Sequence, residues 1–309
     1  MASEVDFPVD STAVGLTYSE YVPGFVKSNP GLLDYVEIAF EQLLHTPDVG
    51  NLRDEIPIVL HCASLSIAGN SPPPPALAAK LAYWVQKTGT PWLGEHLAYV
   101  RSDGRYRDIA EHDAATQAAG ALEANFVLDG TPFNVGYTVS PQLSPPILDR
   151  VLNVSAAWEK QLGTRVLLEN GPVYFSMPGS TMTQVEFFNA MCDRRPEARI
   201  LLDLSHLAIT CANTAIDPFD TLAAFPLDRV VEVHLSGARE EGGTVWDDHT
   251  MPAPKLVFEL FEHLMRKARP RAVTLEYNWD ANFPENIVIN DVARAREIIG
   301  NYSPTAELA

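Results

Sequence analysis

The sequence predicts an α/β fold in which eight parallel strands close into a (β/α)8 barrel of the TIM type. Three observations predict it. Eight short apolar runs recur along the chain, stretches with helical periodicity separate them, and the first run is not followed by a glycine-rich phosphate loop. Such runs are typical of strands buried on both faces, and strands that alternate with helices form a parallel sheet. The length of 309 residues also fits a barrel of this kind.

Each expected strand is rich in Val, Ile, Leu or an aromatic residue. An open, doubly wound sheet is the alternative, but that fold carries a glycine-rich phosphate loop after its first strand, and the segment GLTYSE is not one. Eight strands therefore favour closure into a barrel. The expected strands are Val14–Tyr18, Tyr35–Phe40, Pro57–Leu65, Trp92–Val100, Arg165–Leu168, Ile200–Leu204, Val230–Leu235 and Ala272–Tyr277.

Three of the intervening segments carry clear helix signals. Ala76–Lys87 begins after SPPPP and repeats apolar residues at helical spacing. Pro146–Leu162 ends at Gly163, a typical stop signal. Lys255–Lys267 ends in basic residues, which suit the negative end of a helix dipole. We expect these segments to be helices that follow strands of the barrel.

We expect one barrel domain over residues 14–300, with a disordered lead-in at residues 1–13 and a flexible tail at residues 301–309, because no linker or break in composition divides the chain. The long interval between the fourth and fifth strands contains DGRYRDIAEHDAAT, a second expected helix and DGTPFNVGYTVSPQLSPP. Loops on the C-terminal face of a barrel build the active site, so we expect part of this interval to face the substrate.

The composition argues against several classes of function. No apolar run approaches the ~20 residues needed to span a membrane, and the acidic segment MASEVDFPVD lacks the features of a signal peptide, so we expect a cytoplasmic protein without a membrane partner. The net charge of −18 would repel nucleic acid, whereas it would attract a metal ion or a basic peptide. The three cysteines show no CxxC spacing, which predicts buried thiols rather than disulfides or a zinc ribbon.

Imidazole and carboxylate groups recur at the ends of the expected strands. In a closed barrel these ends point their inward side chains at one central volume, where buried charge is costly unless a cation lies among it. Ligands of these two kinds suit iron, manganese or zinc better than magnesium or calcium. The sequence therefore predicts a metal site. The residues concerned are His61, Glu95, His96, Glu169, Asn170, Asp203, His206, His234 and Glu276, with Asp247, Asp248 and His249 in the loop after the seventh strand.

Local spacing leaves some of these positions open. Glu95 and His96 are adjacent, so in a regular strand only one of them faces inward, and the other lies beside the ligands or on the outer face. Asp203 and His206 are three residues apart and converge only if the chain turns after Asp203. A single histidine at a strand end is more often a hydrogen-bonded core residue, so the prediction depends on the whole set. The sequence has no GxSxG, P-loop or HExxH motif.

The ordered motifs LHCASLS, GEHLAYV, LLENGPVYF, LLDLSHLAIT, VVEVHLSG, DDHTMP and TLEYNWD resemble those of the multinuclear non-haem iron-dependent oxidative enzymes. This family includes the methanobactin-forming oxazolone/thioamide enzyme and the thiaglutamate-pathway enzyme. The resemblance covers nearly the whole chain and implies a TIM-like barrel of the xylose-isomerase-like kind. Two places depart from the family pattern. GLTYSEY matches the opening motif only loosely, and the end of the second strand, EIAFEQLL, has no histidine where several relatives carry one.

The resemblance implies two or three iron ions in mixed Fe²⁺ and Fe³⁺ states, with O2 as co-substrate. It also implies a ribosomally made precursor peptide as substrate, oxidised most often at cysteine, and a partner protein that binds the leader of this peptide. The D-x-H-x-x-P pattern selects Asp247 over Asp248. Glu95 and Asn170 match positions beside the ligands and would orient them. The implied iron ligands are His61, His96, Glu169, Asp203, His206, His234, Asp247, His249 and Glu276.

Three functional hypotheses follow. The first is iron- and O2-dependent oxidation of a residue in a precursor peptide. The second is a redox-neutral isomerase or phosphodiesterase on a barrel like those of xylose isomerase and endonuclease IV, which also bind divalent metals at strand ends. The expected strand ends supply no lysine to polarise a sugar carbonyl, which argues against the isomerase. The third is a non-catalytic peptide-binding subunit, which would have lost ligands.

Overall fold

Eight parallel strands close into a barrel in the computed structural model, which describes residues 11–69, 75–98, 126–128, 131–133 and 140–302. The order around the barrel is β1-β12-β9-β8-β7-β4-β3-β2, and the parallel pair β1–β12 closes it. The predicted (β/α)8 barrel is confirmed, with one strand for each of the eight predicted runs. The strands are β1 (Ala13–Thr17), β2 (Tyr35–Ala39), β3 (Ile58–Cys62), β4 (Trp92–His96), β7 (Arg165–Glu169), β8 (Arg199–Asp203), β9 (Val230–Ser236) and β12 (Ala272–Glu276).

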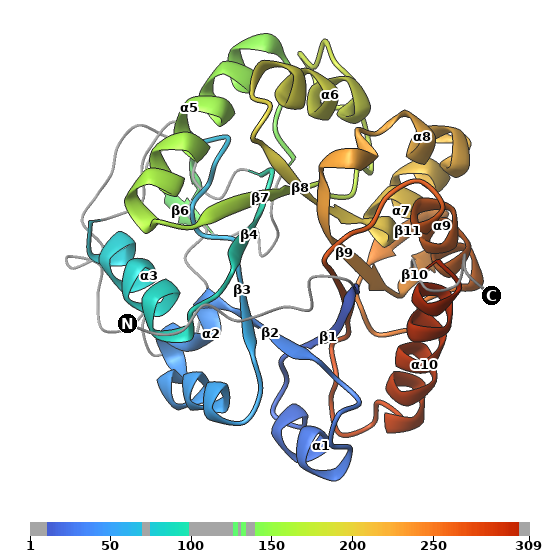
Figure 1. Ribbon diagram of the computed structural model, residues 1–309. Helices are drawn as coiled ribbons and strands as arrows, with labels where there is room; N and C mark the ends of the chain where they lie inside the picture. Colours follow the sequence, from blue (N-terminus) through green and yellow to red (C-terminus); the bar gives the residue numbers. More distant parts are fainter. Residues whose placement is uncertain (1–10, 70–74, 99–125, 129–130, 134–139, 303–309) are drawn as a thin grey trace.

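Helices surround the barrel on its outer side (Figure 1). The three predicted helices are confirmed as α3 (Pro75–Thr88), α5 (Pro145–Leu162) and α9 (Lys255–Met265), although α9 ends two residues before the predicted end. Helix α5 ends at Gly163, whose φ of 68° is the left-handed conformation typical of a glycine stop. The other helices are α1 (Val22–Ser28), α2 (Phe40–His45), α6 (Gln184–Arg194), α7 (Leu204–Thr214), α8 (Pro218–Ala224) and α10 (Glu285–Asn301), with short 3-10 helices η1 (Pro47–Asp54) and η3 (Leu227–Arg229).

In the described part of the chain, two short hairpins add to the barrel. Strands β5 (Phe126–Leu128) and β6 (Thr131–Phe133) pair within the interval between β4 and β7. Strands β10 (Ala238–Glu241) and β11 (Thr244–Asp247) pair directly after β9, so this second hairpin starts at the carboxyl end of a barrel strand.

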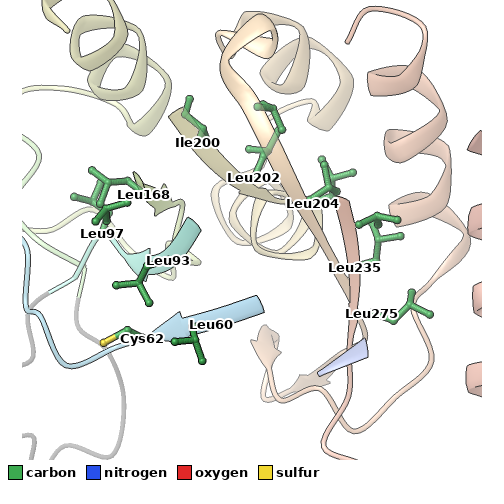
Figure 2. Packing of buried hydrophobic residues seen from close by; sticks show 14 of the residues in the cluster. Leu60, Cys62, Leu93, Leu97, Leu168, Ile200, Leu202, Leu204, Leu235 and Leu275 are labelled. Atoms are coloured by element: carbon green, nitrogen blue, oxygen red, sulfur yellow. The ribbon is translucent and has the colours of Figure 1, made fainter. Parts of the chain in front are cut away.

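Alternate residues of each strand face opposite sides of the barrel wall. Figure 2 shows Leu60 and Cys62 of β3 with Leu93 of β4 among the buried apolar side chains of the larger cluster, which packs the wall against the helices. His61, between two of these residues, therefore faces the inside. All three cysteines are free and buried, as predicted. The smaller apolar cluster inside the barrel consists of Ala13, Tyr35, Val59, Trp92, Leu167, Leu201 and Ala272.

A buried hydrogen-bond network forms the barrel floor, one layer below the strand ends. Glu232 of β9 accepts from Trp92 Nε1 at 2.6 Å and from Thr274 Oγ1 at 2.8 Å, and the Tyr35 hydroxyl lies 2.6 Å from Thr274 Oγ1. Burial raises the pKa of Glu232 to about 8. Gly15 of β1 leaves the space that the Tyr35 ring occupies, because a Cβ at Gly15 would lie 2.3 Å from that ring.

Several predicted segments lie outside the described residues: residues 1–10 of the lead-in, residues 303–309 of the tail and the segment DGRYRDIAEHDAAT. Strand β1 begins at Ala13 and helix α10 ends at Asn301, each one residue beyond a predicted domain boundary. The division into one domain with two terminal segments stays a prediction. Within the described part of the chain, no helix has both the length and the apolar character needed to cross a membrane.

Candidate metal centre

The nine residues implied as iron ligands converge at the carboxyl ends of the barrel strands. Each of them has a nitrogen or carboxylate oxygen within 3.6 Å of another member, and the contacts His206–Glu169 and His249–Glu276 join them into one connected network. Six come from the ends of strands β3, β4, β7, β8, β9 and β12, one from the first turn of α7, and two from the end of β11 and the residues after it. Below, "the network" means His61, His96, Glu169, Asp203, His206, His234, Asp247, His249 and Glu276.

Glu169, the last residue of β7, lies in the middle of the network. Its Oε2 lies 2.9 Å from His61 Nε2 and 3.2 Å from His96 Nε2. Its Oε1 lies 3.3 Å from His206 Nδ1 and 3.7 Å from His234 Nδ1. One carboxylate thus reaches imidazoles from four different elements. Because each of its oxygens faces its own pair of imidazoles, Glu169 is a residue that would hold metal in the middle of the network.

Gly94 of β4 makes room for the His61 imidazole. Trp92, Gly94 and His96 share the inner face of this strand, because side chains alternate along it. A Cβ at Gly94 would lie 2.6 Å from His61 Cδ2 and 3.0 Å from Leu201 Cδ1. Close approach of the His61 imidazole, rather than an unusual backbone conformation, therefore requires glycine here.

The chain turns directly after Asp203, which brings Asp203 and His206 together as the prediction requires. Asp203 ends β8 and caps α7, and its Oδ1 accepts from the His206 backbone nitrogen at 2.6 Å. Asn170 holds this corner. Its side-chain amide donates to the Asp203 carbonyl oxygen and its Oδ1 accepts from the Asp203 nitrogen, both at 2.8 Å. Asn170 therefore contacts one network residue through its side chain and fixes the start of the helix that carries another.

The hairpin β10–β11 brings Asp247 and His249 to the barrel mouth. Asp247 Oδ2 lies 3.0 Å from His206 Nε2, and Asp247 Oδ1 lies 2.8 Å from His249 Nε2. His249 has a left-handed φ of 57°, which is uncommon outside glycine and often marks a functional site. Asp248 turns away and pairs with Arg239 Nε at 3.1 Å. The structure thus places Asp247, and not Asp248, in the network.

Glu37 of β2 joins the site although the motifs at the strand ends do not indicate it. His234 lies between two carboxylates, because its Nδ1 is 3.2 Å from Glu276 Oε2 and its Nε2 is 3.1 Å from Glu37 Oε2. The available signal was the strand YVEIA, where Glu37 is a charged residue in the middle of a buried run. A buried carboxylate needs a partner, and this position lies two residues before the strand end.

Glu95, like Asp248, is a predicted site residue that the structure does not bring to the network. It lies on the outer face of β4, on the same side as Leu93, and is fully buried beside Cys62 and Glu41. Burial, followed by the charge of Glu41, raises the pKa of Glu95 well above its usual range. Of the two adjacent candidates, His96 faces inward. A role for Glu95 in orienting ligands stays a prediction, without a direct contact to support it.

The charges of the network shift several pKa values towards ionised pairs. Burial alone would lower the pKa of His61, but the hydrogen bond and the charge of Glu169, together with the charge of Glu37, outweigh it and raise this pKa to about 10. Burial also opposes charge on His249 and Glu276. Their mutual attraction outweighs it only together with the contacts of His249 to Asp247 and of Glu276 to His234, so that the pKa of His249 is raised to about 9 and that of Glu276 is lowered to about 2. Asp203 behaves in the opposite way, because burial raises its pKa to about 7.

The donor atoms of the network fit bound cations. Buried polar atoms without a hydrogen bond are costly, and a cation would pair with them. Among the described residues, five such atoms belong to the network: His96 Nδ1, Glu169 Oε1, Asp203 Oδ2, His234 Nδ1 and Asp247 Oδ1. Donor atoms also gather in overlapping groups of three within 4.8 Å, namely His61–Glu169–His234, His206–Asp247–His249, Glu37–His234–Glu276 and Glu169–Asp203–His206.

This chain has the features of a class of (β/α)8 barrel proteins. In that class, imidazole and carboxylate groups that could bind metal gather at the carboxyl ends of the strands. Within this class the family can be stated. The family model described as "RiPP precursor modification enzyme MbnB/TglH/ChrH" matches residues 13–118 and 143–300, and the chain belongs to this family. The resemblance predicted from the motifs is thereby confirmed. Membership of this family indicates an enzyme.

Relatives of similar length share this assignment. The chain is 26% identical over 308 residues to a UPF0276 protein of Caulobacter vibrioides, which covers 97% of this chain and 98% of the relative. It is 28% identical over 248 residues to a UPF0276 protein of Anaeromyxobacter, which covers 80% and 77%.

Solved structures share the fold at low sequence identity. Endonuclease IV from Thermus thermophilus has a TM-score of 0.53 and 16% identity, and the match covers 92% of this chain and 99% of that one. L-ribulose 3-epimerase has a TM-score of 0.53 and 12% identity, with 96% of each chain covered. At these identities the likeness shows the fold alone. It confirms the predicted xylose-isomerase-like barrel.

Proposed function

We propose that this chain is a multinuclear non-haem iron enzyme that uses O2 to oxidise a residue, most readily cysteine, in a ribosomally made precursor peptide. The observation that carries the proposal is the convergence of nine imidazole and carboxylate side chains around Glu169, in a family of precursor modification enzymes. Imidazole with carboxylate is a ligand set typical of iron centres that react with O2. Family membership supports a peptide as substrate.

Two or three iron ions, in mixed Fe²⁺ and Fe³⁺ states, would be held by donor groups that share Glu169. Bound iron supplies the one-electron chemistry that lets O2 react with an organic substrate. Glu169 Oε2 faces one pair of imidazoles and Oε1 faces another, so adjacent ions would share this carboxylate. The proposed sets are His61, His96 and Glu169 on one side, Glu169, Asp203, His234 and Glu276 in the middle, and His206, Asp247 and His249 beside the hairpin.

The exposure of the ligands supports entry of the peptide from the barrel mouth. The His234 and Glu169 side chains are at most 1% exposed, whereas the Glu276 side chain keeps 24% of its exposure. Two aromatic side chains lie beside Asp247 of the network. Trp246 precedes it in β11 and is exposed, and Tyr174, whose hydroxyl accepts from the Asp247 nitrogen at 3.3 Å, has its ring 4.9 Å from that of Trp246. Such a surface suits an extended peptide. A leader-binding partner protein and a cytoplasmic location belong to this proposal as predictions.

Metal content and the visible spectrum test the proposal directly. The protein is purified without oxygen, its metals are counted, and spectra are taken before and after brief exposure to air. We expect two or three iron ions per chain and ferric absorption that grows in air. His61→Ala should lower the iron content, whereas His45→Ala, which removes an exposed histidine at the end of α2, should not.

Two results would overturn the proposal. One or two zinc or manganese ions, without spectral change or O2 consumption, would favour the redox-neutral isomerase or hydrolase. A chain that purifies and remains without metal, even after incubation with Fe²⁺, would favour a non-catalytic peptide-binding subunit.

A further inference from the structure

We infer that Glu37 is a positioning residue, which orients His234 so that its Nδ1 atom, and not its Nε2 atom, binds metal; this inference rests on the proposed metal centre. Glu37 Oε2 lies 3.1 Å from His234 Nε2, and both side chains are almost completely buried. The surroundings of the two ring nitrogens of His234 support this role.

The Nδ1 side of His234 faces the other ligands. Nδ1 lies 3.2 Å from Glu276 Oε2 and 3.7 Å from Glu169 Oε1. It is buried and makes no hydrogen bond to any described residue. A buried nitrogen that points at two carboxylates of the network, without a hydrogen bond of its own, is placed as a metal ligand.

The Nε2 side of His234 faces the barrel floor. Glu37 Oε2 is the near neighbour, and Glu232 Oε1 lies 3.9 Å away. Glu232 already accepts hydrogen bonds from Trp92 and Thr274, so its oxygens are engaged below the site. Glu37 is then the group that accepts the Nε2 proton. An imidazole that binds metal through one nitrogen carries its proton on the other, and a carboxylate acceptor fixes both the tautomer and the ring.

The fold holds Glu37 rigidly for this task. Glu37 lies in the middle of β2 and is paired on both sides, with Thr17 of β1 and with Val59 of β3. Strands β1 and β12 separate β2 from β9, so the Glu37 side chain reaches His234 across the inside of the barrel. A contact between side chains of distant strands sets the ring orientation independently of the local backbone of β9.

Metal affinity in a double-mutant cycle tests the inference. Zn²⁺, and Fe²⁺ without oxygen, are titrated into metal-free wild type, Glu37→Gln and Glu37→Ala, and the melting temperature of each variant is recorded. We expect affinity at one ion to fall about tenfold for Glu37→Gln, which keeps an acceptor oxygen but loses the charge, and about 100-fold for Glu37→Ala. The control Glu232→Gln changes the more distant carboxylate and should cost less than about threefold.

The second arm of the cycle removes the imidazole. In a His234→Ala background, Glu37→Gln should change metal affinity by less than about twofold, because Glu37 acts only through His234. His234→Gln repeats this arm with a side chain closer in volume. An effect of Glu37→Gln that persists in both backgrounds would identify Glu37 as a direct ligand and overturn the inference.

Two further outcomes are informative. A lower melting temperature for Glu37→Gln with unchanged metal affinity would show a purely structural role and would also overturn the inference. Wild type that binds Zn²⁺ in the expected cycle, but neither retains Fe²⁺ nor consumes O2, would overturn the proposed function and leave the role of Glu37 in place.

Discussion

The Nδ1 atom of His206 lies 2.8 Å from the backbone carbonyl oxygen of Asn170. A carbonyl oxygen can only accept, so Nδ1 donates its proton to it, and Nε2, which lies 3.0 Å from Asp247 Oδ2, is the nitrogen left to bind a metal once it has lost its proton. Backbone at the end of β7 thus sets the tautomer of a proposed metal ligand on α7. The same residue, Asn170, binds the end of β8 through its side chain.

Replacing Asn170 by Ala should weaken metal binding and stability together. The change removes two buried hydrogen bonds to the Asp203 backbone, worth about 1 kcal/mol each, and loosens the turn that brings Asp203 to His206. We expect a loss of about tenfold in metal affinity, measured by Zn²⁺ titration, and a lower melting temperature. Asn189→Ala is the control, since Asn189 on α6 also donates to backbone carbonyl oxygens but lies outside the network. Unchanged metal affinity in Asn170→Ala would contradict a positioning role.

Asp247 and Asp248 form a matched pair for a second prediction. Asp247 touches His206 and His249, whereas Asp248 pairs with Arg239 on the outside of the hairpin. Asp247→Ala should therefore remove one bound ion and lower activity at least 100-fold, on the order expected for a lost ligand. Asp248→Ala should leave the metal content unchanged, because the Asp248 carboxylate contacts Arg239 and Thr250 rather than the network. Elemental analysis of both variants decides between them, and the reverse pattern would assign the ligand to Asp248.

Gly94→Ala tests the space around His61. The new methyl group would lie 2.6 Å from His61 Cδ2, closer than side-chain atoms approach one another, so the imidazole must move. We expect loss of the ion bound by His61 and His96, with the barrel still folded by circular dichroism. Gly24→Ala in α1 is the control, because nothing lies within 4 Å of a Cβ there, and it should keep its metal. Full metal content in Gly94→Ala would show that His61 does not need its present position.

Metal affinity should fall as pH falls. In the ion-free protein the pKa values of His61 and His249 are raised to about 10 and about 9, so at neutral pH both imidazoles are positively charged and carry a proton on each nitrogen. A metal must displace these protons, and each proton released makes affinity rise about tenfold per pH unit below the pKa of its group. Zn²⁺ titration between about pH 6 and pH 8, with calorimetry in buffers of different ionisation enthalpy to count protons, measures this. An affinity independent of pH would mean that the imidazoles are neutral before the metal binds.

Much of the fold was predictable because a parallel barrel strand is buried on both faces. The run from Val230 to Leu235 is apolar enough to mark β9, and Gly163 marks the end of α5 through its left-handed φ. The hairpin β10–β11 was not predicted as strands, because its residues are partly exposed and its strands are four residues long. A short exposed hairpin has neither the apolar run nor the alternation on which such predictions depend.

The site was predictable where a proposed ligand lies at or near the end of a strand, and it was less predictable elsewhere. His61, Glu169 and His234 follow directly from strand ends, since the barrel brings these ends together. Glu37 required knowledge of which residues lie one layer deeper, and that depends on the stagger of neighbouring strands. Glu95 shows the opposite case. Its motif places it beside a ligand in sequence, while the strand turns it to the outer side of the wall.

The barrel floor determines the side from which the site can be reached. Glu232, Trp92, Tyr35 and Thr274 are buried and bonded to one another, so they close the passage beneath His234. Among the described residues, the opposite side of the site is the barrel mouth, where the Glu276 side chain keeps 24% of its exposure. Under the proposed function, a peptide bound at this mouth would lie between the metal centre and solvent. We therefore expect the metal to bind before the substrate, and bound substrate to slow the exchange of metal with solvent.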